Sequence, residues 1–528
     1  MKTRMLICNA RIYTQADRLV ADSMAVRGNR IVAVGRNLRH DPDLRGYPVV
    51  DLGGKTVVPG FVDAHTHFAY FAVTLGQVNL HGLDSIEACL STVKTFAAKL
   101  AKNEWVVGEG YAPDRWTRRV EPTAAMLDQV TGGRPAFLYS KDQHSCWVNS
   151  RALEMAGITA RTADPGGGRI ERDSEGNPTG LLREGPATKL VFERVPMPLG
   201  KEMDRRYARA LQHAYRMGVT GVHSFDGPEA MRYFMDLAER NRVGLRVVYY
   251  PSADLLPHLL KEKIYFGTGT EFFRIAGVKV FADGSLGSQT ALCFRRYRGS
   301  KSNYGIEVRT VADMRRIIKQ AAKLNLPVAI HAIGDRAVSN VLDAFKTAPP
   351  LDFGARHRIE HLQLTRRSDI VRVKRLGITA SMQPSHCPSD IDMIHRYWGS
   401  RGANAFVFRT LIDRGIPLAF GSDCPIEPLD PIAGIAAAVR RAGPGKRDVF
   451  YPEQRVTAAE AVHNFTVGPA RAAGLEHCRG YLLPGYPADF VVLSQDITKV
   501  AASRIDATRV LATVIDGKVV FADESFSF

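Results

Sequence analysis

The middle of the chain alternates between short apolar runs and segments in which apolar residues recur at helical spacing. Each run is bounded by turn residues, which predicts a buried β-strand. The runs cover residues 56–65, 218–226, 244–250, 275–284, 326–335, 356–364, 377–386 and 416–425. Most are separated by helical patterns, so eight strand–helix units predict an α/β fold, a closed parallel (β/α)8 barrel of the TIM type. One misassigned strand would leave an open sheet instead.

Short apolar runs at both ends of the chain predict a second, smaller β-structure. They cover residues 5–13 and 24–35 near the start, and 488–493 and 510–523 near the end. Within the last run, Asp516–Gly517 is a strong hairpin signal. We therefore expect residues 1–55 and 480–528 to form one β-sandwich domain, flanking a barrel of residues 56–479.

About 150 residues separate the first two predicted barrel strands, which is too many for one crossover connection. This stretch contains strand-like runs at 105–111 and 136–144 and a hairpin pattern around Gly176–Asn177. It predicts an inserted subdomain at about residues 70–200, over the barrel mouth.

Composition narrows the class of protein. Apolar residues make up 45% and charged residues 24% of the chain, which is typical of globular proteins and excludes a largely disordered one. No run approaches the roughly 18 apolar residues of a membrane helix, and the first apolar run is too short for a signal peptide. The seven cysteines are scattered without CxxC spacing, which argues against a disulfide framework and a cysteine zinc site. We expect a soluble, cytoplasmic protein with reduced thiols.

The net charge of +17, from 71 Lys and Arg against 54 Asp and Glu, raises the question of a nucleic-acid partner. The basic residues are dispersed, and no nucleic-acid-binding motif accompanies them. We therefore expect a small-molecule substrate, no specific nucleic acid and no membrane partner. An acidic substrate and a homo-oligomer both stay open.

Polar residues that can bind metal lie near the ends of the predicted strands. His65 and His67 are two apart, so in a strand they point to the same side. Four more candidates lie at or near the C-terminal ends of later strands, the face where barrel active sites form. They are Lys279, His331, His361 and Asp423.

These residue types together favour metal-dependent hydrolysis. Imidazole and carboxylate bind zinc and similar ions, and a bound metal lowers the pKa of its water to about 7. Asp423 could take the water's proton and return it to a leaving nitrogen. Singly, each residue has a structural explanation: a core histidine, or a helix cap in the case of Asp423. Lys279 in an apolar strand is costly unless paired or modified.

Several motifs carry a resemblance to a known family. The segments VVPGFVDAHTH, HAIGD, IEH and GSDCP, in this order, resemble the amidohydrolase superfamily. The segments GEGYAPDRW (108–116), DQHSCWVNSRAL (142–153), GNPTGLLRE (176–184) and VKVFADGSLGSQTA (278–291) are similar to amidohydrolase family 3, the branch that includes N-substituted formamide deformylase. One departure is Gln289, where many relatives would have arginine.

The resemblance implies a two-metal centre. By it, His65, His67, His331, His361 and Asp423 are metal ligands, and Lys279 is a carbamylated lysine that bridges two divalent ions. Zinc is the expected metal, with iron, manganese and cobalt as alternatives. Asp423 would also be the proton shuttle.

Residues around this centre are candidates for substrate contact. They are Asp114, Trp116 and His144 from the insert, and Ser285. Core packing is the alternative for Trp116, and Asp283 and Ser285 could orient Lys279. We interpret His223 as structural, whereas His386 could face the pocket.

The predicted activity is metal-dependent hydrolysis of an amide-type C–N bond, such as that of an N-formyl or N-acyl amine. Metal-bound hydroxide would attack the carbonyl, with Asp423 as the proton shuttle. The alternatives are another reaction on the same scaffold (ester or cyclic-ureide hydrolysis, deamination, isomerisation) or a non-catalytic, metal-binding regulatory protein.

Overall fold

The computed structural model describes residues 4–16, 20–118, 120–141, 143, 145–166, 168–443, 448–526 and 528. The chain forms two compact units: residues 1–69 with 211–528, and residues 70–210. It passes from one unit to the other within helices α1 (Phe68–Thr74) and α6 (Gly200–Arg216). Within these described ranges, every helix is too short or too polar to cross a membrane.

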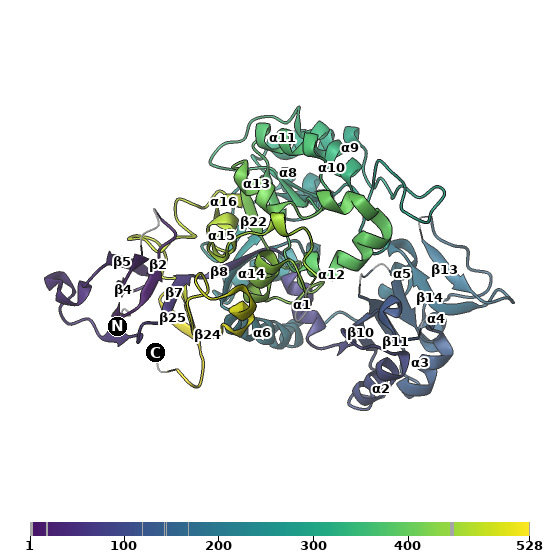
Figure 1. Cartoon of the computed structure of the whole chain (residues 1–528). Coiled ribbons are helices and arrows are strands. Elements are labelled where there is room, and N and C mark those ends of the chain that lie inside the picture. The colour runs from purple at the N-terminus through teal and green to yellow at the C-terminus, as the bar shows by residue number, and fades with distance from the viewer. Residues whose placement is uncertain are drawn as a thin grey trace. The chain divides into compact units, whose positions relative to one another are not determined.

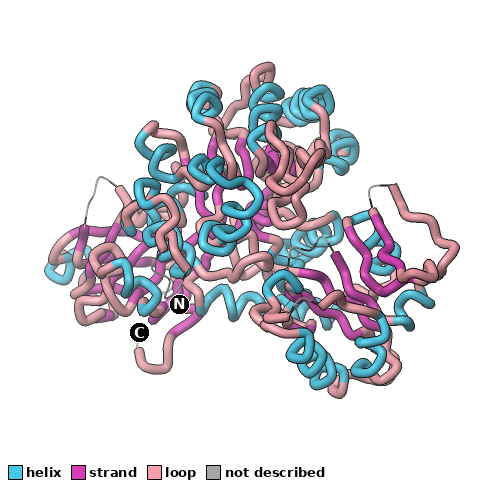
Figure 2. Tube along the Cα trace, turned by 45° about the vertical axis from the view of Figure 1, so that its right-hand side comes forward, coloured by secondary structure: helices cyan, strands magenta, loops and turns pink. Residues whose placement is uncertain are grey.

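Both ends of the chain contribute strands to two β-sheets in the first unit. One sheet has the order β5–β4–β1–β6, and the other has the order β25–β24–β23–β7–β2–β3. The strands are β1 Arg4–Cys8, β2 Arg11–Tyr13, β3 Val20–Ala21, β4 Ser23–Arg27, β5 Arg30–Gly35, β6 Val49–Asp51, β7 Thr56–Pro59, β23 Phe490–Leu493, β24 Val510–Ile515 and β25 Lys518–Ala522. Apolar side chains of both sheets share one core, which includes Ile7, Val26, Phe490 and Val514. The two termini lie beside these strands (Figures 1 and 2).

Strands β24 and β25 form a hairpin at the position that the sequence indicates. Its two turn residues, Asp516 and Gly517, have φ of 56° and 73°. A two-residue turn of this kind needs positive φ at both positions, which Asp-Gly sequences supply.

Parallel strands build the rest of the first unit. They form two sheets, with the orders β17–β16–β15–β8 and β18–β19–β20–β21–β22. The strands are β8 Phe61–Thr66, β15 Val219–Ser224, β16 Arg246–Tyr249, β17 Phe273–Ile275, β18 Val278–Phe281, β19 Val328–Ala332, β20 Arg358–His361, β21 Thr379–Met382 and β22 Leu418–Phe420. Single parallel bridges, Ser252–Lys279 and Thr66–Cys424, connect the two sheets. Each of the eight predicted barrel runs therefore contains a parallel strand, and a ninth strand, β17, lies largely before the fourth run, which contains β18.

Helices alternate with these strands and pack on them by their apolar faces. In α9 the buried residues Met314, Ile317, Ile318 and Ala321 recur at helical spacing, and Thr310 caps the helix by accepting a hydrogen bond from a backbone N–H. The helices are α7 Pro228–Glu239, α8 Leu256–Lys261, α9 Val311–Ala322, α10 Asp335–Phe345, α11 Arg367–Arg375, α12 His386–Met393, α13 Phe408–Asp413, α14 Pro431–Arg440, α15 Ala458–Asn464 and α16 Val467–Ala472. Figure 2 shows helices around the outside of the parallel strands.

The first predicted barrel strand, residues 56–65, is divided at Gly60. The part before it, β7, pairs with β23 and β2 in the terminal sheet, whereas β8 pairs with β15. A Cβ atom on Gly60 would lie 2.2 Å from Oγ1 of Thr220. Only glycine therefore allows the chain to pass so close to β15 as it changes sheets.

The second unit is built around one six-stranded sheet with the order β13–β14–β12–β11–β10–β9. Its elements are β9 Val78–Asn79, β10 Val106–Tyr111, β11 Ala136–Ser140, β12 Ser145–Val148, β13 Arg169–Arg172, β14 Pro178–Arg183, α2 Ile86–Ala97, α3 Ala124–Thr131, α4 Ser150–Met155 and α5 Gly185–Phe192. Trp147 is fully buried in its core and donates its indole N–H to the Thr123 carbonyl at 2.8 Å.

Candidate metal centre

The six predicted metal-binding residues all lie on or just after parallel strands of the first unit. His65, Lys279, His331 and His361 belong to β8, β18, β19 and β20. His67 and Asp423 follow β8 and β22, and the Thr66–Cys424 bridge places these two segments side by side. The Asp423 amide donates to the His65 carbonyl at 2.7 Å, and the His67 amide donates to the Cys424 carbonyl at 2.8 Å. Backbone pairing thus fixes Asp423 against both histidines.

A buried carboxylate reinforces this junction. Asp63 accepts hydrogen bonds from the backbone amides of His65, at 3.1 Å, and Ser422, at 2.9 Å. It therefore ties the end of β8 to the segment that carries Asp423. Burial raises the pKa of Asp63 to about 7, although these amides oppose the shift.

The ligand atoms of several predicted residues converge. Oδ1 of Asp423 lies 3.4 Å from Nε2 of both His65 and His67. Ligand atoms of His65, His361 and Asp423 all lie within 4.8 Å of one another. The His361 ring centroid lies 5.0 Å from that of His65 and 4.5 Å from that of His331. Four histidines and one aspartate from four strands thus meet in one place.

Lys279 is buried beside this cluster. Its Nζ lies 4.6 Å from the ring centroid of Phe225, which also stacks on His65 at 4.3 Å, and 4.9 Å from that of Phe281. In the described part of the chain, no carboxylate lies within ion-pair distance of this ammonium group. Burial lowers the pKa of Lys279 to about 8, although the charges of Glu360 and Asp423 oppose the shift. Part of this amine is therefore neutral and nucleophilic near neutral pH.

One ring nitrogen of His331 already makes a hydrogen bond. Its Nε2 lies 3.0 Å from the Gly284 carbonyl and 3.7 Å from Oδ1 of Asp283, so Nδ1 is the nitrogen left for a metal. Asp283 itself accepts backbone N–H bonds from Leu292, Ile333 and Gly334. It therefore holds the loop after β18 beside His331.

The protonation states suit a divalent cation. Burial and the Lys279 charge lower the pKa of His65 to about 4 and that of His331 to about 3, so both imidazoles are neutral at pH 7. Burial would raise the pKa of Asp423, but His65 and the neighbouring histidines outweigh it and hold the pKa well below its usual value. Neutral imidazoles with an ionised carboxylate are a good donor set for zinc and related ions.

Two further observations fit a metal. Nδ1 of His361 is buried and has no hydrogen-bond partner among the described residues, which is costly unless something else binds it. His361 and Asp423 also have left-handed backbones, with φ of 71° and 63°. Such conformations are rare outside glycine and are concentrated at functional sites.

An ion pair behind His65 was not among the predicted site residues. Oε2 of Glu360 lies 2.5 Å from Nδ1 of His65, and the Arg358 Nε donates to Oε1 of Glu360 at 2.5 Å. Both charged residues are fully buried. Burial would raise the pKa of Glu360, but Arg358 and His65 hold it well below its usual value. The carboxylate therefore keeps the proton of His65 on Nδ1 and leaves Nε2 free to bind a metal.

Arg358 connects this pair to neighbouring strands. It donates to the Ala64 carbonyl at 2.7 Å, to Oγ of Ser381 at 2.6 Å and to Nδ1 of His223 at 2.8 Å. His223 thus has a structural contact, in line with its predicted role. The sequence signal was available: Arg358 and Glu360 are two apart in an apolar strand, so they share one face.

The remaining candidates lie in different places. Nε2 of His386 is 3.8 Å from Oδ2 of Asp423 and has no hydrogen-bond partner within the described ranges. The Ser285 hydroxyl bonds to that of Ser288 at 2.8 Å, within its own turn. Trp116 is buried in the core of the second unit, which favours the packing alternative. His144 and the side chain of Asp114 lie outside the described residues.

Comparison with known proteins adds the family context. The sequence model of the amidohydrolase family matches residues 48–521. The protein LONG AFTER FAR-RED 3 of Arabidopsis thaliana is 33% identical, over 98% of this chain and 91% of its own. An N-substituted formamide deformylase of Arthrobacter pascens is 27% identical, over 97% of each chain. The crystal structure of an uncharacterized metal-dependent hydrolase from Pyrococcus furiosus is 30% identical with a TM-score of 0.77, over 93% of this chain and 99% of that one.

Proposed function

This chain belongs to the amidohydrolase family, and on that premise we propose that it hydrolyses an amide-type C–N bond, such as that of an N-formyl or N-acyl amine. The observation that supports the proposal is the convergence of His65, His361 and Asp423, with His67 at the same carboxylate oxygen. The protein is a metal-dependent hydrolase acting on carbon–nitrogen bonds, and the deformylase relative makes the amide class the first to test.

The proposed ligands form two groups. His65, His67 and Asp423 would hold one divalent ion, and His331 and His361 would hold a second. When bound, such ions supply an activated water and polarise a carbonyl. We favour zinc, because the proposed ligands are mainly imidazole nitrogens with one carboxylate. A closed eight-stranded barrel is the proposed scaffold, supported by the two bridges that connect the parallel sheets.

Asp423 is the proposed proton carrier. Its carboxylate is ionised at neutral pH and is held by the backbone next to the two histidines of the HxH motif. It would accept a proton from the attacking water and then deliver it to the leaving nitrogen, so one group would act first as base and then as acid. Glu360 would keep His65 oriented throughout.

Lys279 is the proposed bridge between the two ions. The neutral amine would react with CO2, forming a C–N bond and losing one proton, to give an anionic carbamate. This change would replace an unpaired buried ammonium by a bidentate oxygen ligand. It is supported by the burial of Lys279 and by the lack, among the described residues, of a carboxylate within ion-pair distance of its ammonium group.

The test combines metal analysis with an activity screen. The purified protein is assayed against N-formyl amines, N-acyl amino acids, cyclic ureides, esters and aminated heterocycles, before and after chelation. We expect amide turnover that chelation removes and metal restores, and about two ions per chain. His65→Ala and Asp423→Asn should lower turnover by at least about 100-fold, whereas His477→Ala, at an exposed position, should not.

Other outcomes would identify other functions. Turnover confined to esters, ureides or aminated heterocycles would replace the amide proposal by another hydrolysis on the same scaffold. Metal-loaded protein without turnover across the whole panel would favour a regulatory role. Unchanged activity in both His65→Ala and Asp423→Asn would refute the proposed site.

A further inference from the structure

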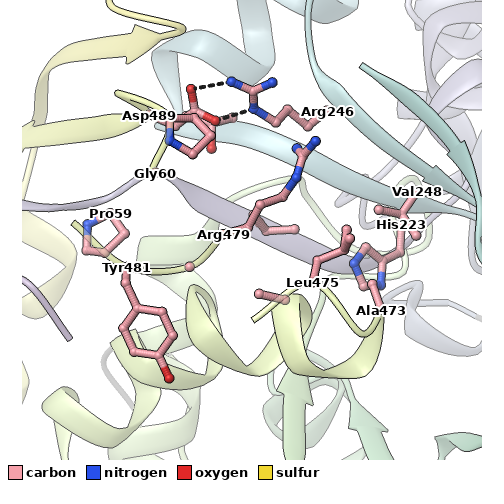
Figure 3. Close-up of a pocket in the computed structure, with 15 residues that line it drawn as sticks. Pro59, Gly60, His223, Arg246, Val248, Ala473, Leu475, Arg479, Tyr481 and Asp489 are labelled. Atoms are coloured by element: carbon pink, nitrogen blue, oxygen red, sulfur yellow. Dashed lines mark hydrogen bonds and ion pairs between the residues drawn. The ribbon is translucent and has the colours of Figure 1, made fainter. Parts of the chain in front are cut away.

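A small cavity lies away from the candidate metal centre, toward the other ends of the same strands. It has a volume of about 40 Å³ and is lined by Val62 of β8, Thr220 of β15 and Arg246 of β16 near their N-terminal ends. The segment that carries Arg479 and Tyr481 also lines it (Figure 3). The candidate ligands, in contrast, lie at the C-terminal ends of the strands.

The charge of Arg246 is largely compensated. Arg246 is 5% exposed and contacts Asp489 through Nε and through NH2, the latter at 2.9 Å. NH2 also donates to Asp516 at 2.9 Å. The third nitrogen, NH1, is buried without a hydrogen-bond partner in the described part of the chain, and Oε2 of Glu271 is 3.9 Å away from it. Arg246 thus keeps one unused donor group while it neutralises Asp489.

The charge of Arg479 is not compensated in this way. Its side chain extends towards Arg246 (Figure 3), and NH2 donates to the Glu271 carbonyl at 2.5 Å. Within the described ranges, no carboxylate lies within 4.0 Å of this guanidinium. Burial and the charge of Arg246 lower the pKa of Arg479 to about 10. Arg479 is partly buried, so its guanidinium loses part of its hydration without gaining a paired carboxylate, and an anion in the cavity would offset that loss.

His223 adds a third donor to the cavity wall. Its Nδ1 accepts a hydrogen bond from Arg358 at 2.8 Å, so the ring proton of the neutral imidazole is on Nε2. Part of the remaining wall, including Val248, Ala473 and Leu475, is apolar, and Thr220, Tyr481 and Asp489 also line the cavity. Donors in apolar surroundings bind anions strongly because little water competes for them.

We propose that this cavity binds a small monovalent anion, of the size of a halide or formate, between Arg479, Arg246 and His223. The carboxylate that lines it, Asp489, does not compete, because Arg246 occupies both of its oxygens. The volume of about 40 Å³ is enough for a halide or formate ion. The proposal is independent of the chemistry at the metal centre.

Bromide is the probe that locates the site. Crystals of the full chain grown without halide are soaked in sodium bromide, and anomalous diffraction is measured at the bromine edge. We expect a peak among the three donors. Its absence at bromide concentrations that label other sites would overturn the proposal.

Thermal unfolding tests the same site in solution. At constant ionic strength, chloride, bromide or formate should raise the melting temperature by about 1–2 °C, saturably, relative to gluconate, a six-carbon anion much larger than a halide or formate. Arg479→Gln should remove this difference, whereas Arg471→Gln, at an exposed position nearby, should keep it. An equal melting temperature in chloride and gluconate would contradict the proposal, even if Arg479→Gln failed to fold.

Discussion

Replacing Arg358 by methionine should destabilise the protein more than most single substitutions. The guanidinium is fully buried and makes two hydrogen bonds to Glu360 and others to Ala64, Ser381 and His223. Methionine fills similar volume but leaves the Glu360 carboxylate buried without its cation. Removing one partner of a buried ion pair typically costs 3–5 kcal/mol, so we expect the free energy of unfolding to fall by about 4 kcal/mol.

A second substitution separates the charge from the packing. In Arg358→Met with Glu360→Leu, no uncompensated charge remains, so the loss should be well below the sum of the two single losses. Arg356→Met is a matched control two residues away, because Arg356 pairs with Glu476 at 2.5 Å near the surface. Its loss should stay within about 1 kcal/mol.

The assay should report on the first unit of the chain. Three of the four tryptophans, Trp105, Trp116 and Trp147, belong to the second unit, so intrinsic fluorescence would mainly follow that unit. Urea unfolding is therefore better followed by circular dichroism, with hydrogen exchange of the β20 amides as a local readout. A loss below about 1 kcal/mol in Arg358→Met, or additive losses in the double variant, would refute the reasoning.

Two further predictions concern positions outside the site. Gly60→Ala places a Cβ 2.2 Å from Oγ1 of Thr220 and should lower the free energy of chemical unfolding by about 1–3 kcal/mol. Gly166→Ala, with open space around it, is the control and should change that free energy by less than about 0.5 kcal/mol. Equal losses of stability in the two variants would contradict the close approach of Gly60 to Thr220. His357 accepts a hydrogen bond from the Val328 amide at 3.0 Å, and burial lowers its pKa to about 4. As the pH falls, His357 is protonated at a higher pH in the unfolded chain than in the folded one. The free energy of unfolding is therefore unaffected by His357 above about pH 6.5 and decreases by roughly 1–3 kcal/mol as the pH falls to about 4. His357→Asn keeps a hydrogen-bond acceptor but does not titrate, so it should reduce this pH dependence relative to wild type. An identical dependence of unfolding free energy on pH in the two proteins would contradict the role of His357.

The short apolar runs in the sequence predict the parallel strands well, because strands that are buried on both faces are continuously apolar. The apolar pattern does not show that residues 56–65 contribute strands to two different sheets. That division depends on the contact between Gly60 and Thr220, residues that are far apart in the sequence. The family model confirms the resemblance that the motifs indicated.

At the candidate metal centre, the two-residue periodicity of a strand does not predict which side chains meet, for a different reason. Glu360 and His361 are adjacent, so alternation would place them on opposite faces of β20. Both nevertheless approach His65, because His361 and Leu362 have left-handed backbones, with φ of 71° and 43°. A backbone conformation of this kind is not visible in the residue pattern. The pair of Arg358 and Glu360 could have been found from its spacing alone.

The pairing of β7 with β23 has a consequence for synthesis of the protein. Pro59 and Phe490 are partners in the terminal sheet, 431 residues apart along the chain. At about 5–20 residues per second, a ribosome needs roughly 20–90 s to make the intervening segment. Throughout that time one edge of β7 exposes unpaired backbone groups, which is a known risk for aggregation. A nascent chain that stalls before β23 therefore carries an open sheet edge that only its own last residues can cover.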